Sequence, residues 1–399
     1  MGLRVGQMVV AAAILSAAAC SPAPAAQGGA VHTSETPAGH VHGAPPPPPA
    51  PLRDGERFLE VGLGQPYRPV PPAAGTDEYR CFLIDPKLAE SSYIMGSQFL
   101  PQNAEIVHHA ILYSVAPSQV EHARSVDAEA RGDGWQCFGG AGLAEGFQSF
   151  GGRGTGVDWI GGWAPGGKET LIGELVGYPI EAGSQIVLQV HYNLMSTKGK
   201  PGPLDQSTVR LRVLPGTAAV KPLTAVRLVA PIELPCTATE SGPLCEREAA
   251  IKDLVKRTGA QARAMVGGLN FLCNKGQTPV PGDTQHCDIP VNEPMLVYAS
   301  APHMHLLGRS ISVELNPGRP DARMLLDQKS FNFDDQSAVL LPQPVQLTKG
   351  DLLRVTCTHD ASVRSKLAEL KQLQPRYVVW GDGTSDEMCL ATLAATTGR

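Results

Sequence analysis

The stretch Ile186-Val187-Leu188-Gln189-Val190-His191-Tyr192-Asn193 decides the fold class, because it is an apolar run of strand length. It is one of several short runs of this kind along the chain: Ala104 to Val115, Gln185 to Tyr192, Thr208 to Val213, Met295 to Ala299, Ser310 to Leu315, Leu352 to Thr356 and Tyr377 to Trp380. Turns rich in glycine and proline separate them, and these two residue types number 43 and 35 among 399 residues. The pattern predicts antiparallel β-sandwiches rather than alternating strands and helices.

One stretch departs from this pattern, because residues 246 to 265 carry apolar side chains at roughly helical spacing. We interpret it as a helical insertion. A length of 399 residues exceeds one typical domain, and a hydrophobic content of 42% is sufficient for two cores. We place the boundary near Pro215-Gly216, so that residues 56–215 form one sandwich and residues 216–399 a second one that contains the insertion.

Three histidines in strand-like runs form a first candidate metal site. His108 and His109 belong to Glu105-Ile106-Val107-His108-His109-Ala110-Ile111-Leu112-Tyr113, and His191 belongs to the stretch quoted above. Adjacent residues of a strand face opposite ways, so the strand must bulge or end for His108 and His109 to bind one metal. Taken singly, a histidine such as His191 is more often a hydrogen-bonded core residue.

A second candidate site combines His303-Met304-His305 with Met388 in Thr384-Ser385-Asp386-Glu387-Met388-Cys389. Two imidazoles and a thioether make a soft site suited to cuprous copper, which implies redox chemistry. If residues 299 to 306 form a strand, the side chains of His303 and His305 project from the same face. Met388 taken alone would be read as a core residue.

These motifs together resemble those of the copper type II, ascorbate-dependent monooxygenases, the family of dopamine beta-monooxygenase and peptidylglycine alpha-hydroxylating monooxygenase. The resemblance rests on the His-His pair, the Gln-Val-His-Tyr strand, the His-x-His followed by Leu306, Leu307 and Gly308, and the Asp-Glu-Met-Cys segment. Their order and approximate spacing match over roughly residues 77 to 393. We therefore interpret the chain as a bacterial member of this family.

The resemblance implies two consecutive antiparallel jelly-roll-like β-sandwich domains with two coppers per chain. It assigns one copper to His108, His109 and His191, and the other, which activates dioxygen, to the catalytic ligands His303, His305 and Met388. A substrate C-H bond would be hydroxylated between them, with ascorbate or another electron donor reducing both coppers.

Substrate identity stays open. Peptide-hydroxylating members carry an arginine two residues before His-x-His and an Asn and a Tyr after Met-Cys, whereas this chain has Ala301, Leu390 and Thr392 there. These differences argue against peptide amidation and leave a small-molecule or peptide-like substrate.

Two alternative functions remain: a periplasmic protein that stores or delivers copper without turnover, and a disulfide-rich sandwich without metal. A zinc hydrolase fits less well, because it would need a His-Glu-x-x-His motif or a comparable arrangement with a nearby carboxylate as general base, and the sequence shows none.

The first twenty residues predict export. Arg4, an apolar stretch from Met8 to Leu15 and the small residues Ala17-Ala18-Ala19-Cys20 form a signal with a possible lipobox, although ordinary cleavage nearby is an alternative. Residues 21 to 55 form a linker rich in proline and alanine. We expect a protein that is periplasmic or lipid-anchored to the cell envelope, touching the membrane only through a lipid on Cys20.

The net charge of the chain is -5, and the sequence contains no basic cluster, which argues against nucleic-acid binding.

Eight cysteines remain after Cys20, and an even number in an exported protein predicts disulfides. The family resemblance suggests that Cys81 pairs with Cys137 and that Cys357 pairs with Cys389. The other four have no such guide: Cys236 with Cys245 and Cys273 with Cys287 are the local pairs, and a crossed arrangement is the alternative.

Overall fold

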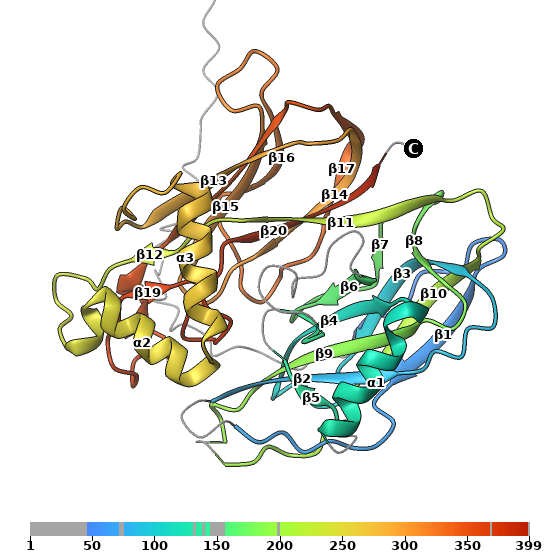
Figure 1. Ribbon diagram of the computed structural model, residues 1–399, viewed down its shortest axis with the longest axis horizontal. Coiled ribbons are helices and arrows are strands. Elements are labelled where there is room, and N and C mark those ends of the chain that lie inside the picture. Colours follow the sequence, from blue (N-terminus) through green and yellow to red (C-terminus); the bar gives the residue numbers. More distant parts are fainter. Residues whose placement is uncertain are drawn as a thin grey trace, which may run out of the picture. The chain divides into compact units, whose positions relative to one another are not determined.

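The computed structural model describes residues 46–71, 76–130, 133–137, 140–143, 156–197, 200–367 and 369–397. The predicted export signal, and the predicted linker as far as residue 45, lie outside these residues. The described chain is mainly β, with antiparallel sheets and a pair of helices in its second half, which confirms the predicted fold class (Figure 1).

Residues up to 215 form two sheets. Their elements are β1 (Arg57–Gly62), β2 (Asp77–Ile84), β3 (Ser92–Leu100), β4 (Val107–Val115), α1 (Val120–Glu129), β5 (Trp135–Gln136), β6 (Val157–Trp163), β7 (Thr170–Leu171), β8 (Val176–Ile180), β9 (Gln185–Asn193) and β10 (Thr208–Pro215). A five-stranded sheet runs in the order β5-β2-β9-β4-β6, and the other sheet contains β1-β10-β3-β8 with β7 paired to β3. Apolar side chains of both sheets share one core.

The second half contains β11 (Lys221–Val229), β12 (Glu233–Leu234), α2 (Arg247–Thr258), α3 (Gln261–Cys273), β13 (Thr284–Pro290), β14 (Met295–His303), β15 (Gly308–Leu315), β16 (Arg323–Gln328), β17 (Val339–Leu347), β18 (Leu352–His359), β19 (Val378–Val379) and β20 (Leu390–Thr397). Its larger sheets are β11-β20-β14-β17 and β13-β18-β15-β16, and β12 pairs with β19. Short 3-10 turns occur at Pro117–Gln119, Pro243–Cys245 and Ala361–Ser365.

One sheet continues across the two halves. Strands β8 and β11 pair in parallel over a short stretch, Lys221 with Val176 and Pro222 with Gly177, which joins β1-β10-β3-β8 to β11-β20-β14-β17. The expected domain boundary falls between the end of β10 at Pro215 and the start of β11 at Lys221. The position of the domain boundary remains a prediction, because the sheet that joins β8 to β11 has strands on both sides of it.

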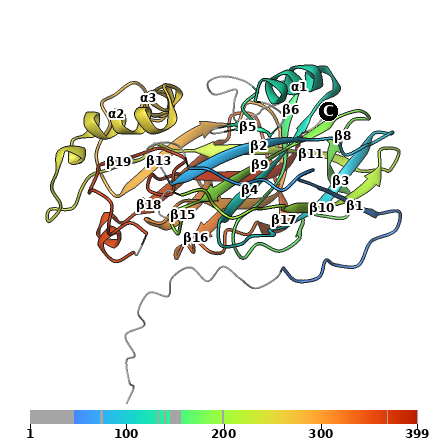
Figure 2. The same ribbon diagram turned by 90° about the horizontal axis from the view of Figure 1, so that it is seen from below.

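The helical insertion consists of two helices rather than one. Gly259 follows α2 with a φ of +99°, a conformation that favours glycine, and α3 begins two residues later. A buried carboxylate, that of Glu233, accepts hydrogen bonds from Arg247 of α2 at 2.6 Å and from Asn270 of α3 at 2.7 Å. Figure 2 shows both helices at the end of the molecule away from α1.

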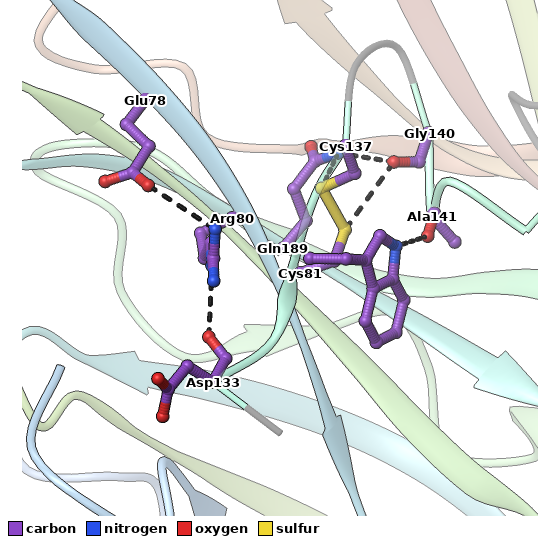
Figure 3. Close-up of a disulfide and its surroundings, with 9 residues drawn as sticks. Glu78, Arg80, Cys81, Asp133, Cys137, Gly140, Ala141 and Gln189 are labelled. Carbon is purple, nitrogen blue, oxygen red and sulfur yellow. Dashed lines mark hydrogen bonds and ion pairs between the residues drawn. A yellow bond between two sulfur atoms is a disulfide. The ribbon is translucent and has the colours of Figure 1, made fainter. Parts of the chain in front are cut away.

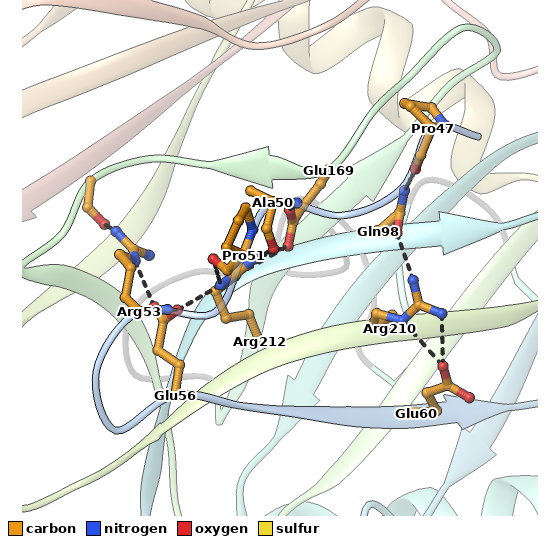
Figure 4. Close-up of polar contacts among 11 residues, drawn as sticks. Pro47, Ala50, Pro51, Arg53, Glu56, Glu60, Gln98, Glu169, Arg210 and Arg212 are labelled. Atoms are coloured by element: carbon orange, nitrogen blue, oxygen red, sulfur yellow. Dashed lines mark hydrogen bonds and ion pairs between the residues drawn. The ribbon is translucent and has the colours of Figure 1, made fainter.

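The chain before β1 is anchored by Arg212 of β10, whose side chain is fully buried (Figure 4). Its guanidinium forms ion pairs with Glu56 at 2.6 Å and with Glu169 at 2.9 Å. It also donates hydrogen bonds to the main-chain oxygens of Ala50 and Pro51. Glu169 lies in the segment after β6, so Arg212 fixes that segment as well.

All four suggested disulfides are present: Cys81–Cys137, Cys236–Cys245, Cys273–Cys287 and Cys357–Cys389. The first ties β2 to the segment after β5, where Gln189 of β9 donates a hydrogen bond to the main-chain oxygen of Gly140 at 2.6 Å (Figure 3). The fourth joins β18 to the residue after Met388. Within the described residues, no helix is long and apolar enough to cross a membrane.

Candidate metal centre

The three histidines of the first candidate site converge. His109 of β4 lies directly opposite His191 of β9, and the register between these strands shifts between Val107 and His109. This irregularity is the bulge that the adjacent pair required, and it lets His108 turn toward the same point. The Nδ1 atom of His109 is 3.4 Å from Nδ1 of His108 and 3.2 Å from Nδ1 of His191. All three residues are buried and close enough to hold one metal ion.

Neighbouring side chains fix the ring of His191. Its Nε2 atom hydrogen-bonds Asp77 at 2.9 Å, which directs Nδ1 toward the other two histidines. Tyr79 stacks on the same ring, with centroids 4.1 Å apart and planes 12° apart. Burial by itself would raise the pKa of Asp77, but the hydrogen bond from His191 holds that pKa below its ordinary value.

His303 and His305 also come together, although not through strand alternation. Strand β14 ends at His303, and His305 lies in the turn before β15. Their ring centroids are 5.2 Å apart. Each ring is held through Nδ1: that of His303 lies 2.8 Å from Oε1 of Gln336, and that of His305 lies 3.1 Å from the main-chain oxygen of Asp386. With this tautomer, both Nε2 atoms are available as ligands.

The turn that carries His305 is fixed by Glu387, whose side chain is fully buried. Its carboxylate accepts hydrogen bonds from the main-chain N-H groups of His305 at 2.9 Å and Leu307 at 2.6 Å. His359 lies 3.3 Å from the same carboxylate. His359, the last residue of β18, therefore also adjoins this site.

Met388, one residue after Glu387, is buried and lines the same cavity as His109 and His303. The ring centroids of His109 and His303 are only 5.6 Å apart, so the two histidine clusters meet. His108 in turn stacks on Phe333 of the second half, with centroids 4.7 Å apart. The six sequence-predicted ligands therefore lie in one region, at the junction of the two halves.

Two of these histidines, His303 and His109, are held in the neutral form that metal binding requires. Burial lowers the pKa of His303 to about 3, and the nearby His305 contributes to this. Burial, and then the neighbouring His191 and His108, also hold the pKa of His109 well below its ordinary value. These rings remain uncharged at neutral pH and keep their lone pairs.

A cavity of about 550 Å³ opens beside these residues. It lies between the five-stranded sheet, which contributes His109, Tyr113 and Trp159, and the face of β11, β20 and β14. Most of its lining is aromatic or aliphatic. A volume of this size is typical of small-molecule sites.

The donor set fits copper. Three imidazole nitrogens converge in the first cluster, and the second offers two imidazoles beside a thioether, a combination that favours copper over hard cations. Nε2 of His305 is buried, and among the residues that the structure describes it has no hydrogen-bond partner. A buried polar atom of this kind requires an explanation, and a bound metal supplies one.

Sequence reasoning missed the residues that orient the ligands. Asp77 and Gln336 lie far from the histidine motifs along the chain, and no local pattern identifies them. Asp386 and Glu387 belong to the Asp-Glu-Met-Cys segment, but their roles depend on contacts with residues more than 80 positions away in sequence. Long-range contacts of this kind leave no local signal.

Residues 281–394 match the family model of the copper type II ascorbate-dependent monooxygenase C-terminal domain. This segment contains His303, His305 and Met388, so the second half of the chain includes a domain similar to those of that family. The buried triad of His108, His109 and His191 resembles a copper site as well. A comparison with curated proteins finds no match.

Solved structures give only distant likenesses. They include an allantoicase (12% identity, 76% of this chain and 86% of that chain covered, TM-score 0.19). The coconut allergen cocosin is 9% identical over 86% of each chain, with a TM-score of 0.16. A 7S globulin of Momordica charantia is 10% identical over 86% of this chain and 74% of its own, with a TM-score of 0.14. Scores this low carry no argument about fold or function.

Proposed function

We propose that this protein is a copper-dependent monooxygenase of the copper type II, ascorbate-dependent class. It would hydroxylate a substrate C-H bond with dioxygen, using ascorbate or another external electron donor. The observation that carries the proposal is the meeting of two histidine clusters, with Met388, at one largely apolar cavity. The match of residues 281–394 to that family supports it.

The overall reaction consumes one substrate C-H bond, one dioxygen, two electrons and two protons, and yields an alcohol and water. Copper held by the two clusters would supply the one-electron redox chemistry and the activation of dioxygen. The remaining contributions come from the chain. Asp77, Gln336 and the main-chain oxygen of Asp386 orient the imidazoles, and Glu387 fixes the turn of His305.

The cavity walls have two further roles. Their aromatic and aliphatic side chains exclude water from the space beside His109 and His303, and they offer a binding surface for the body of an organic substrate. A substrate held there lies against both histidine clusters. Proximity of this kind is what a reaction that needs electrons from two sites requires.

A copper storage or delivery protein is the second candidate function, because it would need the same ligands. It would not need an apolar cavity of about 550 Å³ beside them. The four disulfides fit either function in an oxidising compartment outside the cytoplasm. We place the protein in the periplasm or on the cell envelope, with a small-molecule or peptide-like substrate.

The test is copper stoichiometry of the exported, oxidised protein, followed in the same sample by ascorbate-driven oxygen consumption with a panel of small organic compounds. We expect two coppers per chain and oxygen uptake that depends on the compound. Two coppers without uptake for any compound would favour storage or delivery, and absence of copper after loading would contradict both functions.

Met388→Ala separates the two sites. We expect it to abolish oxygen uptake while copper remains at His108, His109 and His191, because the thioether belongs to the second site only. Met324→Ala is the matched control, since Met324 lies exposed on β16. If Met388→Ala loses copper equally from both sites, the two copper sites are not independent.

A further inference from the structure

Strands β11, β20 and β14 are neighbours in one sheet (Figure 1). One face of these three strands forms the wall of the cavity opposite His109. Side chains of a strand alternate between its two faces, so alternate residues form this wall. They are Leu223 and Arg227 of β11, Leu390, Thr392 and Ala394 of β20, and Ala299, Ala301 and His303 of β14. Arg227 is the one cationic side chain in this set.

The register of the strands places Arg227 relative to the metal site. Arg227 pairs with Thr392, Thr392 pairs with Ala301, and His303 pairs with Leu390. Arg227 therefore lies two strands across and two residues along from His303. Strand spacing and rise put the two Cα atoms roughly 12 Å apart on the same face. That separation suits one small molecule that reaches both residues.

The surroundings of Arg227 make its charge effective. The guanidinium lies 5.8 Å from the ring centroid of Trp159, beside Tyr113. Burial lowers the pKa of Arg227 and outweighs the opposite effects of Tyr113 and Asp158. Asp158 is exposed, so solvent screens its attraction. A partly buried positive charge interacts more strongly with an anion that enters the cavity than an exposed charge would.

The other charged residues around the cavity are less suited to this role. Lys168 is exposed, and Glu169 is already paired with Arg212 at 2.9 Å. Asp335 is bonded to Ser337 on the surface. Asp382 is the competing group: it is buried on the segment before Met388, and it would favour an ammonium group instead.

We propose that Arg227 determines substrate specificity by binding a carboxylate, so that the cavity selects an organic anion with an aromatic or aliphatic body. The carboxylate would lie against Arg227 and Trp159, and the body would extend along Thr392 and Leu390 toward His303 and Met388. The assignment of which end of the substrate reacts rests on the proposed monooxygenase function. The binding of the carboxylate by Arg227 does not depend on that function.

The test is calorimetric binding to the copper-loaded full chain without reductant. The probes are 3-phenylpropionate, 4-phenylbutyrate and 5-phenylvalerate, each compared with its amide and with the phenylalkylamine of matched length. We expect at least one acid to bind about tenfold or more tightly than its amide, as a charge-assisted hydrogen bond implies. Arg227→Gln should remove this preference, and Arg227→Lys should retain part of it.

Arg210→Gln is the matched control, because Arg210 lies on β10 and pairs with exposed Glu60. It should keep the preference for acids. Circular dichroism confirms folding of each variant, and Arg227→Lys decides the matter if Arg227→Gln does not fold. Four results would overturn the proposal: tighter binding of the amines, an unchanged preference in Arg227→Gln or in Arg227→Lys compared with wild type, loss of the preference in Lys168→Gln, or no binding by any probe.

Oxygen uptake with the same probes separates this inference from the proposed function. If acids bind through Arg227 but no compound of any class supports oxygen uptake, the anion site is supported and the monooxygenase function is contradicted. Uptake that is equal for acids, amides and amines, with no difference in binding, would support the monooxygenase and reject the role of Arg227.

Discussion

The orientation of His191 depends on a single carboxylate, that of Asp77. It accepts hydrogen bonds from His191 at 2.9 Å and from the hydroxyl of Thr384 at 2.5 Å. Thr384 lies four residues before Met388, so Asp77 links the first histidine cluster to the segment that carries the thioether. This arrangement is typical of carboxylates that support metal-bound histidines.

Asp77→Asn should weaken copper binding at the first site by about 10- to 100-fold, because the amide is a poorer acceptor and can present an N-H group to the ring. Competition with a chelator measures the affinity of each site. Asp288→Asn is the control, since Asp288 pairs with Arg354 on β13 and β18, away from both clusters. Unchanged affinity in Asp77→Asn would show that the ring is fixed by packing against Tyr79 alone.

The turn of His305 depends in the same way on Glu387. Replacement by Gln keeps the shape but places an N-H₂ group against one of two buried main-chain donors. We expect a loss of about 1–3 kcal/mol in the free energy of unfolding. Chemical denaturation of the copper-free protein measures it. Equal stability of Glu387→Gln and wild type would indicate that the turn relaxes and that the carboxylate does not hold it.

At the scale of elements, the sequence indicates the candidate ligands because they lie in short motifs of characteristic residue type and order, and their role as ligands stays a prediction. Two adjacent histidines of one strand can bind one metal only if the strand bulges or ends, and the register shift between Val107 and His109 meets this requirement. A strand over residues 299 to 306 would place His303 and His305 on one face, but β14 ends at His303. The two rings approach each other because Glu387 and Asp386 hold the turn, and these contacts come from a segment more than 80 residues later.

The helical insertion also acquires a role that its sequence pattern does not reveal. Arg257 of α2 forms two hydrogen bonds with the carboxylate of buried Asp386, at 2.6 and 3.0 Å. The main-chain oxygen of Asp386 in turn accepts from His305. Helix α2 therefore supports the segment that carries Glu387 and Met388 from outside.

Arg257→Ala should cost about 3–5 kcal/mol in the free energy of unfolding, because it leaves Asp386 buried without its charged partner. Copper affinity at the second site should fall more than at the first. Arg257→Lys should recover part of both. The control is Arg263→Ala, which removes an exposed ion pair with Glu248 and should change stability by less than about 1 kcal/mol. Equal effects of the two alanine variants would rule out a supporting role for α2.

At the scale of the whole described chain, the two halves share structure. The sheet passes from β8 to β11, and the core of the first half includes Leu223, Ala299 and Ala394 of the second. The sequence indicated two sandwiches because each half has its own set of strands. It could not show that they share a sheet, since the pairing of β8 with β11 involves only two residue pairs.

This sharing predicts that the two halves unfold together. Scanning calorimetry of the copper-free protein should show one transition, because separation of the halves would expose apolar surface that both contribute to the first core. In His108→Ala, copper should bind at His303, His305 and Met388 only. Free copper at a concentration of about 100 times the dissociation constant of this site should stabilise the folded chain by about 2.7 kcal/mol. The single unfolding transition should then move as a whole to a higher temperature. Two transitions, of which copper moves only one, would show that the halves are independent and that their close approach at His109 and His303 is not enforced by the fold.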